Sequence, residues 1–352
     1  MSAEIGAERA SGEPRYATAT PGPRLPIPDV LRGVAILAML IAHAAPFVPD
    51  IPTVLLYVQS NINDLASPLF ALVMGISAQL VWNRRAGIAR TWLQQSWRGV
   101  LLIALGIWMA SWGSWVMIVL QSLGMLLIIG VPLLLLSTRT LVIVAAAIVL
   151  LSQPLLTLVR GALWVYTQPH LVIELANAFA LGPSYRLINL LPFFLLGAVL
   201  LRHGFTRGPL LWTMTAVAPL AYVASFAIDR FGGVDVQSGD YLDTLHDVGL
   251  VFAAYVVVVL VFTARGRVMH RAFEPFRAGG QVALSLYVLH VGIIALWARA
   301  SGIPQENEPL GWLVIVPGMV LVSWAWVRFV GTGPIEWALG WLAGRPKRSR
   351  AA

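Results

Sequence analysis

The chain has 352 residues, of which 58% are hydrophobic and 11% charged, and its mean hydropathy is +0.78. Soluble proteins carry about 25% charged residues, so the composition excludes a soluble globular domain and predicts an all-α, polytopic helical bundle in a membrane. The formal net charge is +8, but most basic residues lie in short loops and tails, where they orient spans rather than bind nucleic acid. The absence of cysteine excludes disulfides, thiolate nucleophiles and thiolate metal ligands.

The N-terminal segment 1–26 is polar and rich in Gly, Pro, Ala and Glu, so we expect a disordered cytoplasmic tail. The first apolar run contains "AHA", which imitates a cleavage site, but this run follows a long polar lead and continues to about Val48. The pattern therefore predicts an uncleaved first span rather than a signal peptide. We expect one transmembrane domain over 27–344, followed by a basic cytoplasmic tail over 345–352.

Apolar windows of about 20 residues predict ten membrane-spanning helices. The third and fourth are expected to form a tight hairpin around the Trp-Gly-Ser-Trp segment 112–115, and the sixth contains Pro192. The loop 159–186 is expected to hold a short interfacial helix or part of a site. The predicted spans are 29–48, 65–82, 97–113, 116–136, 140–158, 187–201, 209–228, 248–264, 280–298 and 310–330.

Basic and acidic loops alternate along the chain and predict how the spans are oriented. The loop 229–247 carries five aspartates against the single Arg230, whereas the alternate loops and the C-terminal tail are basic. The positive-inside rule therefore predicts a multi-pass protein of the plasma membrane with both termini in the cytoplasm. The basic residues are Arg84, Arg85, Arg90, Arg98, Arg139, Arg202, Arg207, Arg265, Arg267, Arg271, Arg277, Arg345, Lys347, Arg348 and Arg350.

The first span carries Asp29, Arg32 and His43, although ionisable groups are costly in hydrocarbon. The spacing of Arg32 and His43 puts them within about 20° of one helix face and roughly 16 Å apart along the axis. Arg32 is expected either to pair with Asp29 at i, i+3 or to hold an anionic ligand entering from the cytoplasm. His43, towards the outer side, is expected to be a hydrogen-bonded packing residue or a base that titrates near neutrality.

Further polar residues lie in other predicted spans. Asp64 starts the second span at the outer side, where it would approach and orient the histidine of the first span. In the ninth span, Tyr287 and His290 are neighbours at i, i+3 and predict a second polar cluster. Ser285 is expected to form interhelical hydrogen bonds, and Gln121 of the fourth span is expected to face the bundle.

These residues lead to a family resemblance. Arg32 and His43 match the Arg-x10-His signature of the membrane acyltransferase-3 family, which O-acetylates surface sugars. "DVLRGVAILAML", "NDLASPLFALVMGISAQL", "WRGVLLIALGI" and "VLQSLGM" resemble heparan-α-glucosaminide N-acetyltransferase and its bacterial relatives. "SLYVLH" resembles a late span of both families, and "FVGTGPIEWALGWLAG" resembles YeiB-like bacterial membrane proteins. The heparan-type enzyme has Asn in place of His43 and a His in its first outer loop, about where this chain has Val54.

The resemblance implies an enzyme that moves an acyl group, expected to be acetyl, from cytoplasmic acyl-CoA to a cell-envelope acceptor. The acceptor would be a sugar hydroxyl or amine, or a lipid-linked molecule, at the outer face. Arg32, Arg84, Arg85 and Arg90 would attract the phosphates of acetyl-CoA or another acyl-CoA. No grouping of His, Asp and Glu has the spacing of a metal site, so no metal is expected. The other expected partner is the lipid bilayer, with no nucleic acid; a homo-oligomer is left open.

The same resemblance implies roles for the polar residues of the outer half. His43 would be the general base, Asp64 would orient it, and Tyr287 or His290 would steady the developing oxyanion. A covalent acyl-histidine is left open. Two other functions are also left open. One is a small-molecule transporter that uses the same polar residues, and the other is a catalytically silent scaffold for envelope-building enzymes.

Overall fold

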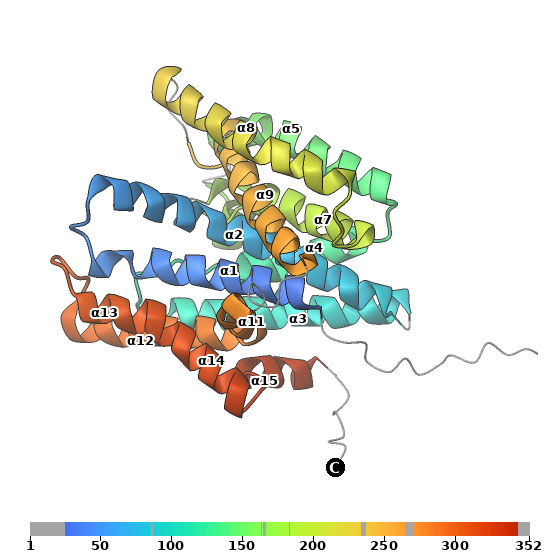
Figure 1. Cartoon of the computed structure of the whole chain (residues 1–352). Helices are drawn as coiled ribbons and strands as arrows, with labels where there is room; N and C mark the ends of the chain where they lie inside the picture. The colour runs from blue at the N-terminus through green and yellow to red at the C-terminus, as the bar shows by residue number, and fades with distance from the viewer. Residues whose placement is uncertain are drawn as a thin grey trace, which may run out of the picture.

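The computed structural model describes residues 25–343, apart from 86, 163, 165, 166, 183, 234–236 and 265–270. The predicted basic tail 345–352 and residues 1–24 of the predicted N-terminal tail lie outside this part. Regular structure in the described residues is entirely helical, which confirms the predicted all-α class (Figure 1). The elements are α1 (Pro26–His43), η1 (Ala45–Phe47), α2 (Thr53–Asn83), α3 (Ile88–Ala110), α4 (Leu120–Leu133), α5 (Thr138–Gly161), α6 (His170–Ala176), η3 (Asn177–Leu181), α7 (Leu187–His203), α8 (Pro209–Phe231), α9 (Tyr241–Thr263), α11 (Glu274–Gln281), α12 (Ala283–Ser301), α13 (Pro309–Leu313), η4 (Val314–Gly318), α14 (Met319–Phe329) and α15 (Pro334–Leu342).

Seven of the described helices are long and apolar enough to cross a bilayer. They are α1, α2, α5, α8, α9, α12 and the continuous helix made by α13, η4 and α14. Three more helices, α3, α4 and α7, overlap predicted spans, but α4 and α7 have only 14 and 17 residues. The multi-pass membrane class is therefore confirmed, whereas the count of ten spans and the cytoplasmic termini stay predictions.

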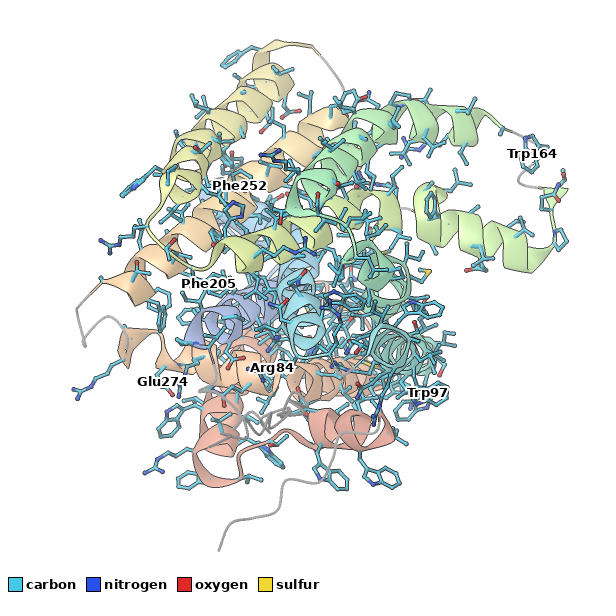
Figure 2. The ribbon with its side chains drawn as sticks, turned by 90° about the vertical axis from the view of Figure 1, so that its right-hand side faces the viewer. Arg84, Trp97, Trp164, Phe205, Phe252 and Glu274 are labelled. Atoms are coloured by element: carbon cyan, nitrogen blue, oxygen red, sulfur yellow. The ribbon has the colours of Figure 1, made fainter. Side chains whose placement is uncertain are left out.

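Helices at the periphery of the bundle turn large apolar side chains outward. Leu150 and Leu158 of α5 and Leu220 of α8 are exposed. Trp164, which follows α5, also lies at the edge of the molecule (Figure 2). Water would penalise so much exposed apolar surface, so these faces are suited to contact lipid.

The helix α1 lies between α2 on one side and α11 and α12 on the other (Figure 1). Glycines allow the backbones of α1 and α11 to touch. A Cβ on Gly33 would lie 1.7 Å from the Phe276 carbonyl oxygen, and one on Gly280 would lie 1.8 Å from the Asp29 carbonyl oxygen. Close approach through small residues is how membrane helices gain packing energy, because lipid supplies no hydrophobic driving force between them.

Helices α2 and α7 approach each other through a second glycine pair. A Cβ on Gly75 would lie 1.8 Å from the Phe194 carbonyl oxygen, and one on Gly197 would lie 2.0 Å from the Leu72 carbonyl oxygen. Gly75 belongs to α2 and Gly197 to α7, so each helix has a glycine notch, a position without a side chain, at which the backbone of the other helix packs. This contact fixes α2, which in turn packs on α1.

Two helix boundaries differ from the predicted ones. His43 is the last residue of α1, because the chain turns into a short 3-10 helix that contains Pro46. The helix α2 begins at Thr53, well before the predicted second span, so Asp64 lies inside a helix rather than at its start. The apolar windows begin this span only at residue 65, because the first turns of α2, residues 53–64, mix apolar and polar side chains.

The predicted helical hairpin is interrupted by an irregular segment over 111–119. The helix α4 begins at Leu120, so the predicted start of the fourth span at 116 is wrong. Gly113 has a positive φ of 75°, which permits the turn, and Val116 and Val119 are buried. Non-helical backbone at membrane depth is tolerated where protein groups satisfy it. Here Tyr287 does so, because its hydroxyl accepts a hydrogen bond from the Val119 N–H at 3.2 Å.

The glycine notch between α2 and α7 predicts a position-specific loss of stability. Gly75→Ala forces the two backbones apart and should lower the free energy of unfolding by about 1–3 kcal/mol, the usual effect of overpacking. Thermal unfolding in detergent measures this change. Gly161→Ala is the matched control, because a Cβ at Gly161 meets nothing within 4 Å. Equal melting of the two variants would contradict the packing role.

Candidate functional site

Two histidines from opposite ends of the chain meet in the bundle. His43 ends α1, and His290 lies in the middle of α12. Their rings are nearly parallel, with an interplanar angle of 12° and centroids 5.2 Å apart, and they meet edge to edge because His43 Nδ1 lies 2.9 Å from His290 Nε2. His290 is fully buried, and the His43 residue is half-buried. The structure therefore pairs a fully shielded imidazole with one that lies at the partly exposed end of α1.

The hydrogen bonds of the pair define which nitrogen carries each proton when both rings are neutral. His290 Nδ1 lies 3.0 Å from the Leu286 carbonyl oxygen, which only accepts, so this nitrogen donates. His290 Nε2 then has a lone pair and accepts from His43 Nδ1–H. The remaining nitrogen, His43 Nε2, is left with a lone pair. This is the protonation state that a general base requires.

The same reasoning bears on the role expected of His290. Both of its nitrogens are engaged, one by the Leu286 carbonyl and the other by His43. In this arrangement its N–H is already donated to the Leu286 carbonyl, and the predicted oxyanion role of His290 stays a prediction. The contact that the structure gives His290 is the hydrogen bond with His43, the position expected for Asp64.

The irregular segment 111–119 forms one wall around the histidine pair. Trp115 Nε1 donates to the His43 carbonyl oxygen at 3.1 Å, which satisfies a carbonyl at the end of α1. On α12, the Tyr287 ring packs edge-on against His290 with centroids 5.3 Å apart. The structure therefore confirms the predicted Tyr287–His290 contact, and Tyr287 connects to this segment by accepting from Val119 N–H.

At the other end of α1, Arg32 joins three helices. Its Nη1 donates to Asp29 Oδ1 at 3.2 Å and to the Gly280 carbonyl at 3.1 Å, while Nη2 donates to Ser77 Oγ at 2.7 Å. The predicted pairing with Asp29 is confirmed. The Arg32 side chain remains 26% exposed, so it is not sealed off from a ligand. Its role in binding an anionic donor stays a prediction.

An apolar groove with a cavity volume of about 40 Å³ lies along α1 between these two ends. Gly33, Ile36 and Leu40 follow one helical stripe in its wall, and His43 comes next on the same stripe. The groove therefore extends from beside Arg32 to one helical turn before the imidazole pair. The remaining lining residues are Leu37, Pro275, Phe276, Gly279, Leu286, Val320 and Ser323.

Asp64 has a different partner from the predicted one. Its Oδ2 lies 3.9 Å from His246 Nδ1 of α9, and His246 Nε2 lies 3.0 Å from Asn61 Oδ1. Tyr222 of α8 donates to the same Asn61 oxygen at 2.8 Å. The prediction that Asp64 orients His43 is therefore wrong, because Asp64 belongs to a cluster of α2, α8 and α9 and His290 binds His43 instead.

Gln121 and Ser285 lie at helix contacts, as predicted. Gln121 is half-buried at the start of α4, where its side chain covers Gly106 of α3. Ser285 Oγ donates to the carboxylate of Glu336 in α15. Both residues therefore connect helices, and the contact of Ser285 confirms its predicted interhelical hydrogen bond.

The basic residues between the end of α2 and the start of α3 are open to solvent. Arg84 and Arg90 are exposed, and Arg84 lies at the end of the bundle that Figure 2 turns towards the viewer. Arg85 is exposed as well, although it donates to the Trp82 carbonyl at 3.0 Å and stacks over the Trp82 ring. Their attraction of donor phosphates stays a prediction.

Four residues that contact the predicted site residues were not predicted from the sequence. Trp115, Ser77 and His246 each contact a predicted site residue, and Glu336 contacts Ser285. Signals for two of them were present. Glu336 is an acid within an apolar C-terminal stretch, and His246 lies between two aspartates at helical spacing. Neither pattern indicates which residue of the fold is contacted, so the sequence alone does not predict these two contacts.

The helical bundle and its paired imidazoles define a multi-pass membrane protein with a site suited to proton transfer. Residues 69–328, well over half of the 352, match a family model described as an acyltransferase domain. The chain therefore belongs to the acyltransferase-3 family and is a membrane acyltransferase in general class. The matched range contains His290 but begins after α1, and so excludes Arg32 and His43. Comparison with curated proteins gives no match.

The assigned tautomers can be tested by nitrogen-15 NMR of histidine-labelled protein in nanodiscs. At about pH 8.5, two units above an ordinary imidazole pKa, both His43 and His290 should carry the proton on Nδ1. His43→Asn and His290→Asn identify the two sets of signals by removing them. A proton on His43 Nε2 would contradict the hydrogen-bond assignment.

Proposed function

We propose that this protein transfers an acyl group, expected to be acetyl, from cytoplasmic acyl-CoA to a cell-envelope acceptor at the outer face. The acceptor would be a hydroxyl or amine of a sugar or lipid-linked molecule. The observation that carries the proposal is the hydrogen bond from His43 Nδ1 to His290 Nε2. It leaves His43 Nε2 with a lone pair, and the apolar groove beside Gly33, Ile36 and Leu40 ends one helical turn before this residue. The family supports acyl transfer as the reaction type.

In the proposed reaction, His43 Nε2 takes the proton of the acceptor hydroxyl as its oxygen attacks the thioester carbonyl. The tetrahedral intermediate then collapses and the carbon–sulfur bond breaks. The departing CoA thiolate receives the proton that His43 Nε2 took from the acceptor. The products are the acylated acceptor and free CoA, so atoms and protons balance. His290 supports the protonated state of His43, since a hydrogen bond from an imidazolium is stronger than one from a neutral ring.

In this proposal the groove beside α1 is part of the route for the donor arm. A pantetheine arm is thin and extended, and the groove wall follows the helical stripe from Gly33 to Leu40. Its phosphates would stay at the basic end, near Arg32 and the exposed Arg84, where guanidinium groups suit them. Both termini lie in the cytoplasm in this proposal, so the donor enters at the end where α1 begins.

Substitution of the base should abolish transfer. Loss of a general base costs typically 10²–10⁴-fold in rate, so His43→Ala should lower acetyl transfer by about that factor. The assay follows CoA release from acetyl-CoA by purified protein in nanodiscs, with envelope sugars and lipid-linked sugars offered as acceptors. His203→Ala is the control, because His203 is exposed at the end of α7. Full transfer by the His43 variant would sink the proposal, and substrate flux without CoA release would indicate a transporter.

The groove predicts where the donor binds. Gly279→Leu places a side chain into the groove, and a Cβ there meets Ile36 only at 3.5 Å, so the backbone can stay in place. Acetyl-CoA binding should weaken tenfold or more, about 1.4 kcal/mol, as measured by calorimetry. Gly161→Leu, at the exposed end of α5, should bind like the wild type. Unchanged affinity of the Gly279 variant for acetyl-CoA would show that the donor does not bind in this groove.

A further inference from the structure

The C-terminal helix α15 lies beyond the family match, which ends at residue 328, yet it contacts the helix that carries His290. Glu336 is the contacting residue. Its Oε1 accepts from Leu284 N–H at 2.7 Å and from Ser285 N–H at 3.2 Å, and its Oε2 accepts from Ser285 Oγ. The first N–H groups of a helix have no partner within the helix, so this carboxylate caps the start of α12 from outside.

The contact is reciprocal and closely packed. Ile335 N–H donates to Ser285 Oγ at 3.1 Å, so Ser285 both gives and receives a hydrogen bond from α15. A Cβ on Gly333 would lie 2.1 Å from Glu336 Oε2 and 2.6 Å from Ser285 Oγ. In the Gly-Thr-Gly-Pro-Ile-Glu segment, 331–336, the second glycine therefore leaves room for the contact between Glu336 and Ser285.

The far end of α15 is held as well. Trp97 Nε1 of α3 donates to the Leu342 carbonyl at 3.2 Å, and Gln94 Nε2 donates to the Ala343 carbonyl at 2.9 Å. The helix α15 thus bridges α3 and α12. It is a fixed brace rather than a loosely attached tail.

A short path leads from this brace to the histidine pair. Glu336 holds the backbone of Leu284 and Ser285, and the next residue, Leu286, supplies the carbonyl that accepts from His290 Nδ1. His290 then accepts from His43. The carbonyl that defines the tautomer of His290 therefore lies next to the residues that Glu336 anchors.

We propose that Glu336 is a positioning residue. By capping α12 from α15, it holds His290 at hydrogen-bond distance from His43. Its effect on turnover rests on the proposed function, whereas its effect on the histidine contact does not. A carboxylate is suited to the task, because it accepts several hydrogen bonds at once and carries the charge that a helix N-terminus favours.

The test compares Glu336→Ala, Glu336→Asp and Glu336→Gln with Glu306→Ala, which removes an exposed glutamate from a loop. Glu336→Ala should lower kcat for acetyl transfer about tenfold or more, while the Kd of acetyl-CoA changes less than about twofold. The histidine NMR signals of the pair should shift from their wild-type positions in the same variant. Glu336→Gln keeps one acceptor oxygen, so its kcat should lie between those of the wild type and Glu336→Ala. Glu336→Asp should recover part of the loss in kcat, and Glu306→Ala should match the wild type.

The readouts separate failure of this inference from failure of the proposed function. Wild-type kcat and unchanged histidine signals in Glu336→Ala would overturn the positioning role. If the wild type transfers no acyl group, the NMR signals still decide whether Glu336 controls the contact between His43 and His290. If Glu336→Ala does not fold, the same comparison is made with Glu336→Gln, where wild-type signals and wild-type kcat would again overturn it.

Discussion

Hydrocarbon offers no hydrogen bonds to a membrane helix, so polar side chains in the bundle are stabilised by partners within the protein, either on their own helix or on another. Three interhelical junctions meet this constraint. Arg32 joins α1 to α2 and α11, His43 joins α1 to α12, and Glu336 joins α15 to α12. Apolar side chains tolerate small shifts of one helix along another, but a hydrogen bond of about 3 Å does not. These junctions therefore define the relative positions of the helices that carry the site.

Close helix packing makes the junctions possible. Arg32 reaches the Gly280 carbonyl because Gly33 and Gly280 let α1 and α11 touch. The chain then bends at Val282, between α11 and α12, so that α11 stays on α1 while α12 turns His290 towards His43. On the opposite wall, the irregular segment 111–119 replaces helical hydrogen bonds with contacts to the site. Its non-helical backbone is the structural cost of bringing Trp115 and Val119 to α1 and α12.

The sequence predicted what local pattern determines. Hydrophobic windows located the helices, and i, i+3 spacing placed Tyr287 beside His290 and Asp29 beside Arg32, because neighbours on one helix need no knowledge of the fold. It did not predict that His43 meets His290, since 247 residues separate them and many polar pairs satisfy the same windows. Asp64 shows the same limit. A short loop made a contact between α1 and α2 plausible, but the direction of a side chain depends on helix rotation, which hydrophobicity alone leaves loosely defined.

A neutral imidazole in place of an orienting carboxylate has a physical rationale within the proposed reaction. Desolvating a carboxylate at the buried position of His290 would cost several kcal/mol, whereas a neutral imidazole at that position does not carry this penalty. The same choice has a consequence for catalysis. His290 accepts a hydrogen bond but brings no negative charge, so it stabilises protonated His43 less than a carboxylate would. A long-lived imidazolium is therefore unfavourable in this site. The proton should pass from acceptor to departing thiolate in closely coupled steps, which favours direct transfer over a stable charged acyl-histidine.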